Sequence, residues 1–152
     1  MDEGTFWGIV ESFDWDQSGD DDAVIEPAVT ALAAMPATEI RSFQSILATR
    51  LYELDTMAHA ENIGEDAYRG EDEAFSVDQF LYVRCVVVAN GRDYFGQVLA
   101  DPTAMPKSME FESLLYVADQ AHERSTGEAL VSDPAVSYET FSNRTGWGHA
   151  DA

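Results

Sequence analysis

The sequence predicts an all-α protein, a single-domain bundle of about six helices with an irregular C-terminal tail. Three observations support this prediction: apolar residues recur every three or four positions, cap residues stand before those stretches, and glycine or proline follows them. Of the 152 residues, 45% are hydrophobic, which is enough for one well-filled core. We expect residues 1–127 to form the helical domain and residues 128–152 to form a turn-rich tail packed on it or trailing from it.

Two short helices are expected near the N-terminus. Thr5–Phe13 places its apolar side chains at helical spacing, with Asp2 or Thr5 as the cap. Val24–Met35 forms the second helix, which tolerates Pro27 if that residue lies in the first turn.

Longer helices are expected on either side of the middle of the chain. Residues 38–60 form an amphipathic helix capped by Thr38, because their apolar positions step by three or four throughout. Residues 62–73 are an acidic turn or short helix punctuated by glycine. Ser108 is expected to cap a further helix that runs to Arg124.

The middle of the chain is predicted to be the centre of the fold. Ser76 and Gln79 form a capping box, in which each satisfies a backbone donor of the other. The helix Val77–Asn90 that follows is apolar nearly all round, as a buried helix is. Its three consecutive valines favour a strand, but the cap, the length and the stop at Gly91 favour a helix. Arg92–Ala100 then forms a short helix.

The charge balance is strongly acidic. There are 29 acidic residues against 8 basic ones, a net charge of −21, and Lys107 is the only lysine. Such a field repels phosphates, so the sequence predicts binding neither to nucleic acid nor to a membrane. Three explanations are open: solubility or adaptation to high salt, attraction of a basic protein partner, and cation binding by clustered carboxylates. The acidic N-terminus lacks the basic region of a secretory signal, so a cytoplasmic location is expected.

One acidic segment comes close to a calcium-binding loop. An EF-hand loop needs oxygen ligands at alternate positions, glycine at position 6 and a bidentate glutamate at position 12. Position 12 is Ile25 here, and Glu26 comes one residue late. We therefore predict no metal site. Instead, we expect Asp20, Asp21 and Asp22 to cap the next helix. The oxygen ligands of the near miss are Asp14, Asp16, Ser18, Asp20 and Asp22.

The sequence gives no indication of catalysis or of a cofactor. The single Cys85 excludes an internal disulfide, and it stands in the most apolar stretch, where a buried inert thiol is expected. His59, His122 and His149 are not spaced as metal ligands, and neither a GxSxG elbow nor a glycine-rich phosphate loop occurs. No catalytic residue is predicted.

One set of polar residues lies in or near the central helix pair and forms the candidate ligand site. In one interpretation, Arg84 or Arg92 forms a partly buried ion pair with Asp78 or Glu112. In the other, the two arginines line a cleft that binds a carboxylate or a phosphate. The candidate residues are Asp78, Tyr82, Arg84, Arg92, Glu112 and Tyr116.

Four stretches together resemble a known family. They read FW..I near the start, PATEIRSFQ, DQFLYVRCVVVANGRDYFGQVLADP, and ESLLYVADQAHERSTG. Over Phe6–Gly127 the chain resembles an uncharacterised bacterial family, the domain of unknown function 4240. Tyr82-Val83-Arg84 stands for its YFR, Gly91-Arg92 for its GR, Tyr94 for its tyrosine, and Tyr116-Val117-Ala118 for its YVA. The chain differs in EDAYRGEDEAFSVDQ, in CVVV where the family has a tryptophan, and in His122 where it has a tyrosine. The resemblance implies a helical fold. It brings no established activity with it.

Two classes of function follow. The first is a non-enzymatic binding or regulatory module with a basic protein partner, of which an acidic immunity or inhibitor protein is a specific version. The second is a small-ligand-binding domain or enzyme that uses the arginines, tyrosines and carboxylates around Arg84 and Arg92. The sequence gives no indication of oligomeric state.

Overall fold

Helices are the regular elements of residues 1–149, the part of the chain that the computed structural model describes, and no strand occurs there. This confirms the all-α class, with one helix more than expected. Residues 150–152 of the predicted tail lie outside the described residues. In order, the α-helices are α1 (Glu3–Val10), α2 (Asp21–Ala33), α3 (Ala37–Glu53), α4 (Met57–Ala60), α5 (Val77–Ala89), α6 (Arg92–Ala100) and α7 (Val117–Thr126). Short 3-10 helices are η1 (Trp15–Gln17), η2 (Pro102–Ala104), η3 (Glu112–Tyr116) and η4 (Thr145–Trp147).

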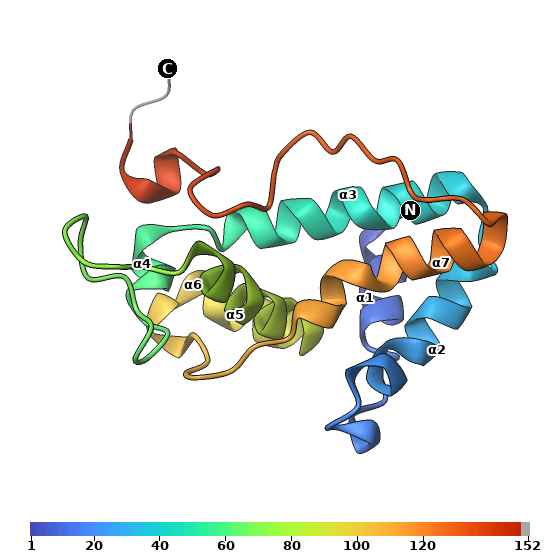
Figure 1. Ribbon diagram of the computed structural model, residues 1–152, viewed down its shortest axis with the longest axis horizontal. Coiled ribbons are helices and arrows are strands. Elements are labelled where there is room, and N and C mark those ends of the chain that lie inside the picture. Colours follow the sequence, from blue (N-terminus) through green and yellow to red (C-terminus); the bar gives the residue numbers. More distant parts are fainter. Residues whose placement is uncertain (150–152) are drawn as a thin grey trace.

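The helices form two groups joined by α3, the longest of them (Figure 1). At one end α7 packs on both α2 and α3, and α1 packs on α2 and α3 as well. At the other end α5 packs on α3 and α6. After α7 the chain returns along α3 toward α4, so the C-terminal segment and α3 lie side by side (Figure 1). No helix of residues 1–149 is long and apolar enough to cross a membrane.

The central position predicted for α5 is confirmed. Its residues from Val83 to Ala89 are all buried, so apolar contacts surround this helix. The Ser76 hydroxyl accepts a hydrogen bond from the backbone N–H of Gln79 at 3.1 Å, as a helix cap does. Burial on every side explains why the three valines are accommodated in a helix, because tertiary packing outweighs their weak preference for a strand.

The single helix predicted over residues 38–60 is wrong. The chain leaves the helix at Leu54 and starts again as α4, with the Thr56 hydroxyl accepting a hydrogen bond from the N–H of His59 at 3.1 Å. Thr38 lies inside the first turn of α3, which begins after Pro36. The break directs the carboxylate of Asp55 into the interior, where it is fully buried.

Other helix boundaries also differ from those expected. The first helix, expected over Thr5–Phe13, is α1 over Glu3–Val10, with Asp2 as its cap. Ser108 does not cap a helix, because its backbone has a positive φ of 55° and its N–H bonds to the carbonyl of Ile63. The helical segment starts at η3 instead and continues as α7, which ends at Gly127 in the left-handed conformation. At the other end of the chain α2 starts at Asp21, so Pro27 lies beyond the first turn.

Candidate functional site

Arg84 lies in the interior and holds the C-terminal segment. It projects from α5 and is fully buried. Its Nη1 donates hydrogen bonds to the backbone carbonyls of Leu51 and Tyr138, each at 2.9 Å, and its Nη2 donates to the Thr140 hydroxyl at 3.0 Å. Its guanidinium also lies over the ring of Phe80, 4.6 Å from the centroid. Its partners are thus neutral oxygens, and the ion pair predicted with Asp78 or Glu112 is wrong for this arginine.

Asp55 is the second buried charge that holds the C-terminal segment. Its carboxylate accepts hydrogen bonds from the backbone N–H groups of Phe141 at 3.2 Å and Asn143 at 3.0 Å, and from the indole N–H of Trp147 at 2.8 Å. Burial lowers the pKa of Arg84, and the carboxylate of Asp55 opposes that shift. We call Arg84 and Asp55 the tail clamp, because between them they bind the chain from Tyr138 to Trp147.

Sequence reasoning missed Asp55. The amphipathic helix predicted over residues 38–60 includes this residue, and an aspartate in such a helix is expected on the solvent-exposed face. A signal was present nonetheless: Asp55 is followed by Thr56, a good N-cap that marks a new helix start.

Four of the predicted site residues meet at the surface. The hydroxyl of Tyr116 donates a hydrogen bond to Glu112 at 2.6 Å, which raises the pKa of Tyr116 to about 12. Glu112 also raises the pKa of Tyr82, with a smaller contribution from Asp78 one helical turn away. The two tyrosines therefore share Glu112, and Asp78 adds negative charge beside Tyr82, so this cluster does not attract an anion.

Arg92 lies at a different place from both Arg84 and this cluster. It is exposed at the first position of α6 and lines a surface hollow with Trp7, Arg50 and Phe95. Arg50 forms ion pairs there with Glu3 at 3.2 Å and with Glu53 at 3.5 Å. The structure thus separates the two arginines that the sequence placed in one cleft.

Two of the EF-hand-like aspartates, Asp14 and Asp20, serve as helix caps. Asp14 accepts the N–H of Asp16 at 3.2 Å, and Asp20 accepts the N–H of Ala23 at 3.2 Å at the start of α2. The capping role predicted for residues 20–22 is confirmed for Asp20, whereas Asp21 and Asp22 lie inside the first turn of α2. No group of three or more His, Cys, Asp or Glu side chains within residues 1–149 is arranged to hold a metal ion.

Three other titratable side chains are buried: His59, Cys85 and His122, whose Nδ1 lies 2.8 Å from the carbonyl oxygen of Glu128. His59 bonds to the carbonyl of Val98 through Nε2 at 2.9 Å and to the Thr56 hydroxyl through Nδ1 at 2.6 Å. The carbonyl only accepts, so Nε2 carries the proton of the neutral ring. Burial lowers the pKa of His59 and raises the pKa of Cys85 to about 12. The prediction of a buried cysteine is confirmed.

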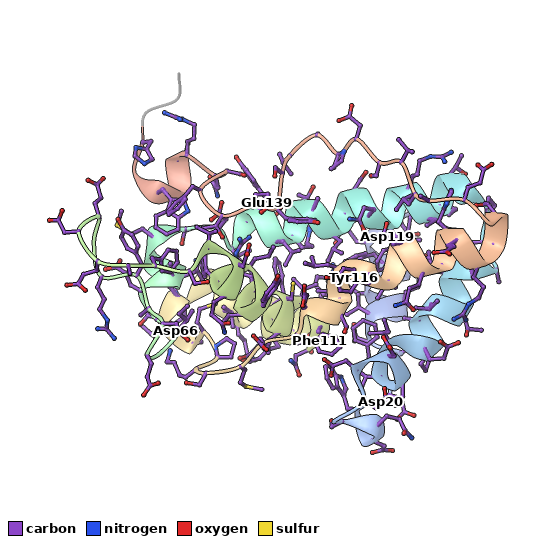
Figure 2. The ribbon with its side chains drawn as sticks, in the orientation of Figure 1. Asp20, Asp66, Phe111, Tyr116, Asp119 and Glu139 are labelled. Atoms are coloured by element: carbon purple, nitrogen blue, oxygen red, sulfur yellow. The ribbon has the colours of Figure 1, made fainter. Side chains whose placement is uncertain are left out.

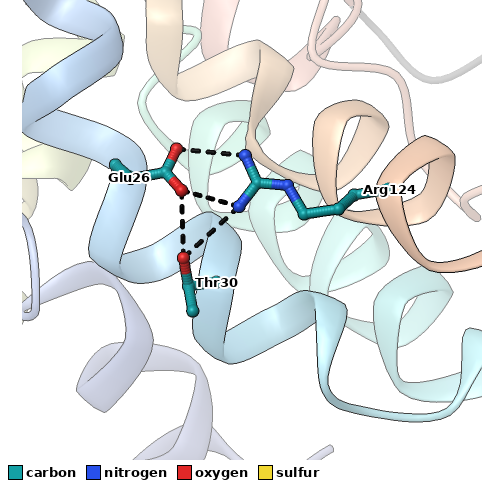
Figure 3. A network of polar contacts seen from close by, with 3 residues as sticks. All are labelled: Glu26, Thr30 and Arg124. Carbon is teal, nitrogen blue, oxygen red and sulfur yellow. Dashed lines mark hydrogen bonds and ion pairs between the residues drawn. The ribbon is translucent and has the colours of Figure 1, made fainter.

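Half of the eight basic residues are bound within the fold. Besides Arg50 and Arg84, Arg124 of α7 forms a forked pair with Glu26 of α2, at 2.6 and 3.0 Å, and also contacts Thr30 (Figure 3). Lys107 donates to three backbone carbonyls, those of Asn62, Thr103 and Met105. These four cations therefore form internal contacts, and they do not neutralise the remaining surface carboxylates.

Residues 61–73 form an exposed acidic loop between α4 and α5. Lys107 and the backbone of Ser108 fix its first residues. Arg69 is its only base, and none of its carboxylates takes part in a hydrogen bond or ion pair within residues 1–149. Asp66 in this loop and Asp20 in the N-terminal acidic turn, residues 14–22, lie well apart in the view of Figure 2. The loop's acidic residues are Glu61, Glu65, Asp66, Glu71, Asp72 and Glu73.

Comparison with protein families gives one match. The family is described as a protein of unknown function, DUF4240, and the match covers residues 1–124. The chain belongs to the DUF4240 family. Comparisons with curated proteins and with solved structures found no match. The DUF4240 match includes Asp55 and Arg84, whereas the segment from Tyr138 to Trp147 that they bind lies beyond its end.

Proposed function

We propose that this DUF4240 member is a non-enzymatic binding module that recognises a basic protein surface through the acidic loop, residues 61–73. The observation that carries the proposal is the set of six exposed carboxylates in that loop, which are accompanied by one arginine and form no ion pair with any other part of residues 1–149. An immunity or inhibitor protein that masks a basic toxin surface is a specific version of this function.

Physical reasons favour a basic protein over other partners. Exposed carboxylates speed the approach of a positively charged protein and repel phosphate backbones and anionic lipid. The N-terminal acidic turn is a weaker candidate, because Asp14 and Asp20 already accept backbone hydrogen bonds. Lys107 and Ser108 bond to the carbonyls of Asn62 and Ile63, and the N–H of Tyr68 bonds to the carbonyl of Ala60, so the first half of the acidic loop is anchored to the body of the protein.

Affinity capture with charge-matched variants tests this proposal. The loop variant carries Glu71→Gln, Asp72→Asn and Glu73→Gln, and the control loses the same charge at the scattered exposed positions Asp16, Glu110 and Glu123. We expect the wild type and the control to retain the same basic proteins at about 50 mM salt and to release them at about 500 mM, because salt screens exposed charges. The loop variant should retain much less. Equal capture by both variants, or capture without a bias toward basic proteins, would refute the proposal.

A second candidate function is binding of a small anion in the hollow beside Arg92. It is supported by the position of this exposed arginine near Arg50, Trp7 and Phe95. The ion pairs of Arg50 with Glu3 and Glu53 reduce the positive charge available there. Phosphate or a dicarboxylate at millimolar concentration should raise the melting temperature of the wild type but not of Arg92→Gln. An equal response of the two proteins would exclude this site.

A further inference from the structure

The acidic loop and the C-terminal segment enclose a hollow lined by aromatic rings. Its volume is about 340 Å³. Two rings come from the loop region, Tyr68 and Phe75, and two from the C-terminal segment, Phe141 and Trp147. The ring centroids of Phe141 and Trp147 are 4.6 Å apart, and those of Tyr68 and Trp147 are 5.0 Å apart, both at steep angles. Edge-to-face contact is a preferred packing of aromatic rings, so these contacts hold the rings that line the hollow in place.

The backbone at Phe141 is unusual in a way that concerns this hollow. Its φ is +75°, a left-handed conformation that a bulky residue rarely adopts. The N–H of the same residue donates to Asp55, so the tail clamp holds the backbone in this conformation. Phe141 is 44% exposed even though its ring contacts those of Phe75 and Trp147. Strained backbone of this kind concentrates at binding sites, where the surrounding structure fixes it.

The charge around the hollow selects the ligand. Glu71 and Glu73 line it together with the four rings and His149, and neither carboxylate has an ion-pair partner within residues 1–149. The face of an aromatic ring carries negative electrostatic potential and attracts cations within about 6 Å of its centroid. Carboxylates and ring faces together favour a cation whose apolar stem contacts the rings, and they disfavour anions.

We propose that this hollow binds an arginine or lysine side chain. The proposal deepens the proposed function, on which it rests for the source of the cation: a basic partner protein would insert one such side chain between Tyr68, Phe75 and Phe141. The apolar stem would pack on the rings, and the charged end would meet Glu71 or Glu73. The pocket thus serves as the anchor point, and the rest of the acidic loop provides attraction at longer range.

A titration with N-acetyl-arginine N-methylamide, followed by NMR, tests the proposal. The matched control ligand is the citrulline derivative, which has nearly the same shape and no charge. We expect the arginine derivative to shift resonances of residues 68–75 and 141–149 with millimolar affinity, and the citrulline derivative to leave them unchanged. Equal shifts with both ligands, or shifts confined to other parts of the protein, would overturn the proposal.

Variants connect the binding to the named side chains. Phe141→Leu removes one ring and keeps an apolar side chain, and Glu71→Gln with Glu73→Gln removes the charge. Each should weaken binding of the arginine derivative at least about threefold, whereas Glu65→Gln, at an exposed position that does not line the hollow, should leave it unchanged. If Phe141→Leu fails to fold, the glutamine variant alone decides. Affinity that is unaltered in the variant or variants that fold would contradict the assigned pocket.

The two proposals fail separately. Basic proteins captured through the acidic loop, together with no binding of the free arginine derivative, would overturn the pocket and leave the proposed function. Binding of the arginine derivative in the hollow, together with capture that ignores the loop, would support the pocket and overturn the proposed function.

Discussion

Replacing Asp55 by asparagine tests the tail clamp with a change of a single atom. The carboxylate accepts three hydrogen bonds, from the N–H groups of Phe141 and Asn143 and from the indole of Trp147. The amide of asparagine keeps two acceptor contacts at best and turns its NH₂ toward the N–H of Asn143, two donors face to face. A charge-assisted hydrogen bond contributes roughly 1.5–3 kcal/mol, and a buried N–H left unsatisfied costs about 1–3 kcal/mol.

Relief of the carboxylate's desolvation offsets part of this loss, while the buried Arg84 loses its nearby compensating charge. The net expectation is a loss of about 3 kcal/mol in the free energy of unfolding. For a chain of this length each kcal/mol lowers the melting temperature by about 2–4 °C, so Asp55→Asn should melt roughly 6–12 °C lower.

Thermal unfolding followed by circular dichroism measures the change. The control is Asp66→Asn, which removes the same charge from an exposed position and should shift the melting temperature by no more than about 2 °C. Hydrogen exchange of residues 138–149 shows whether the C-terminal segment opens before the rest of the protein. A melting temperature for Asp55→Asn within 1–2 °C of the wild type would refute the role assigned to this buried carboxylate.

Three further predictions follow from buried contacts. Gly146→Ala should destabilise the protein by more than about 1 kcal/mol in denaturant unfolding, because an added Cβ would lie 2.9 Å from the carbonyl oxygen of Asp55 and from Thr56. Burial lowers the pKa of His59 below 6.5, so as the pH falls the unfolded chain takes up the proton before the folded one does. The free energy of unfolding should therefore decrease below about pH 6.5, and it should decrease less in His59→Gln. The thiol of Cys85, with a pKa of about 12, should react with a disulfide reagent at pH 8 only after unfolding.

Local signals in the sequence predict the central part of the fold. Ser76 and Gln79 mark the start of α5, and an apolar run without a polar face indicates burial on all sides. Positions that depend on long-range contacts were predicted wrongly. Ser108 has the side chain of a cap, but the carbonyl of Ile63, 45 residues away in the chain, holds its backbone in another conformation. The periodicity of apolar residues does not predict this contact between Ser108 and Ile63.

The candidate site illustrates the same limit. Proximity in sequence and membership in one helix pair suggested that Arg84 and Arg92 act together. Arg84 points into the interior toward Tyr138 and Thr140, and Arg92 lines a surface hollow. A buried arginine is expected to form an ion pair with a carboxylate, yet Arg84 donates its hydrogen bonds to the backbone carbonyls of Leu51 and Tyr138 and to the Thr140 hydroxyl. Acceptors of this kind are present at every residue, so composition cannot indicate which of them an arginine will reach.

The hydrogen bonds of Arg84 and Asp55 also concern where the chain can be shortened. A fragment cut at residue 127 would keep every helix from α1 to α7 and the whole family match. It would nevertheless remove hydrogen-bond partners of the Arg84 guanidinium and of the Asp55 carboxylate. It would also expose an apolar surface that includes Phe80. We therefore expect the folded unit to extend beyond the boundary of sequence similarity. Recombinant fragments intended for crystallisation or binding assays should extend at least through residue 149.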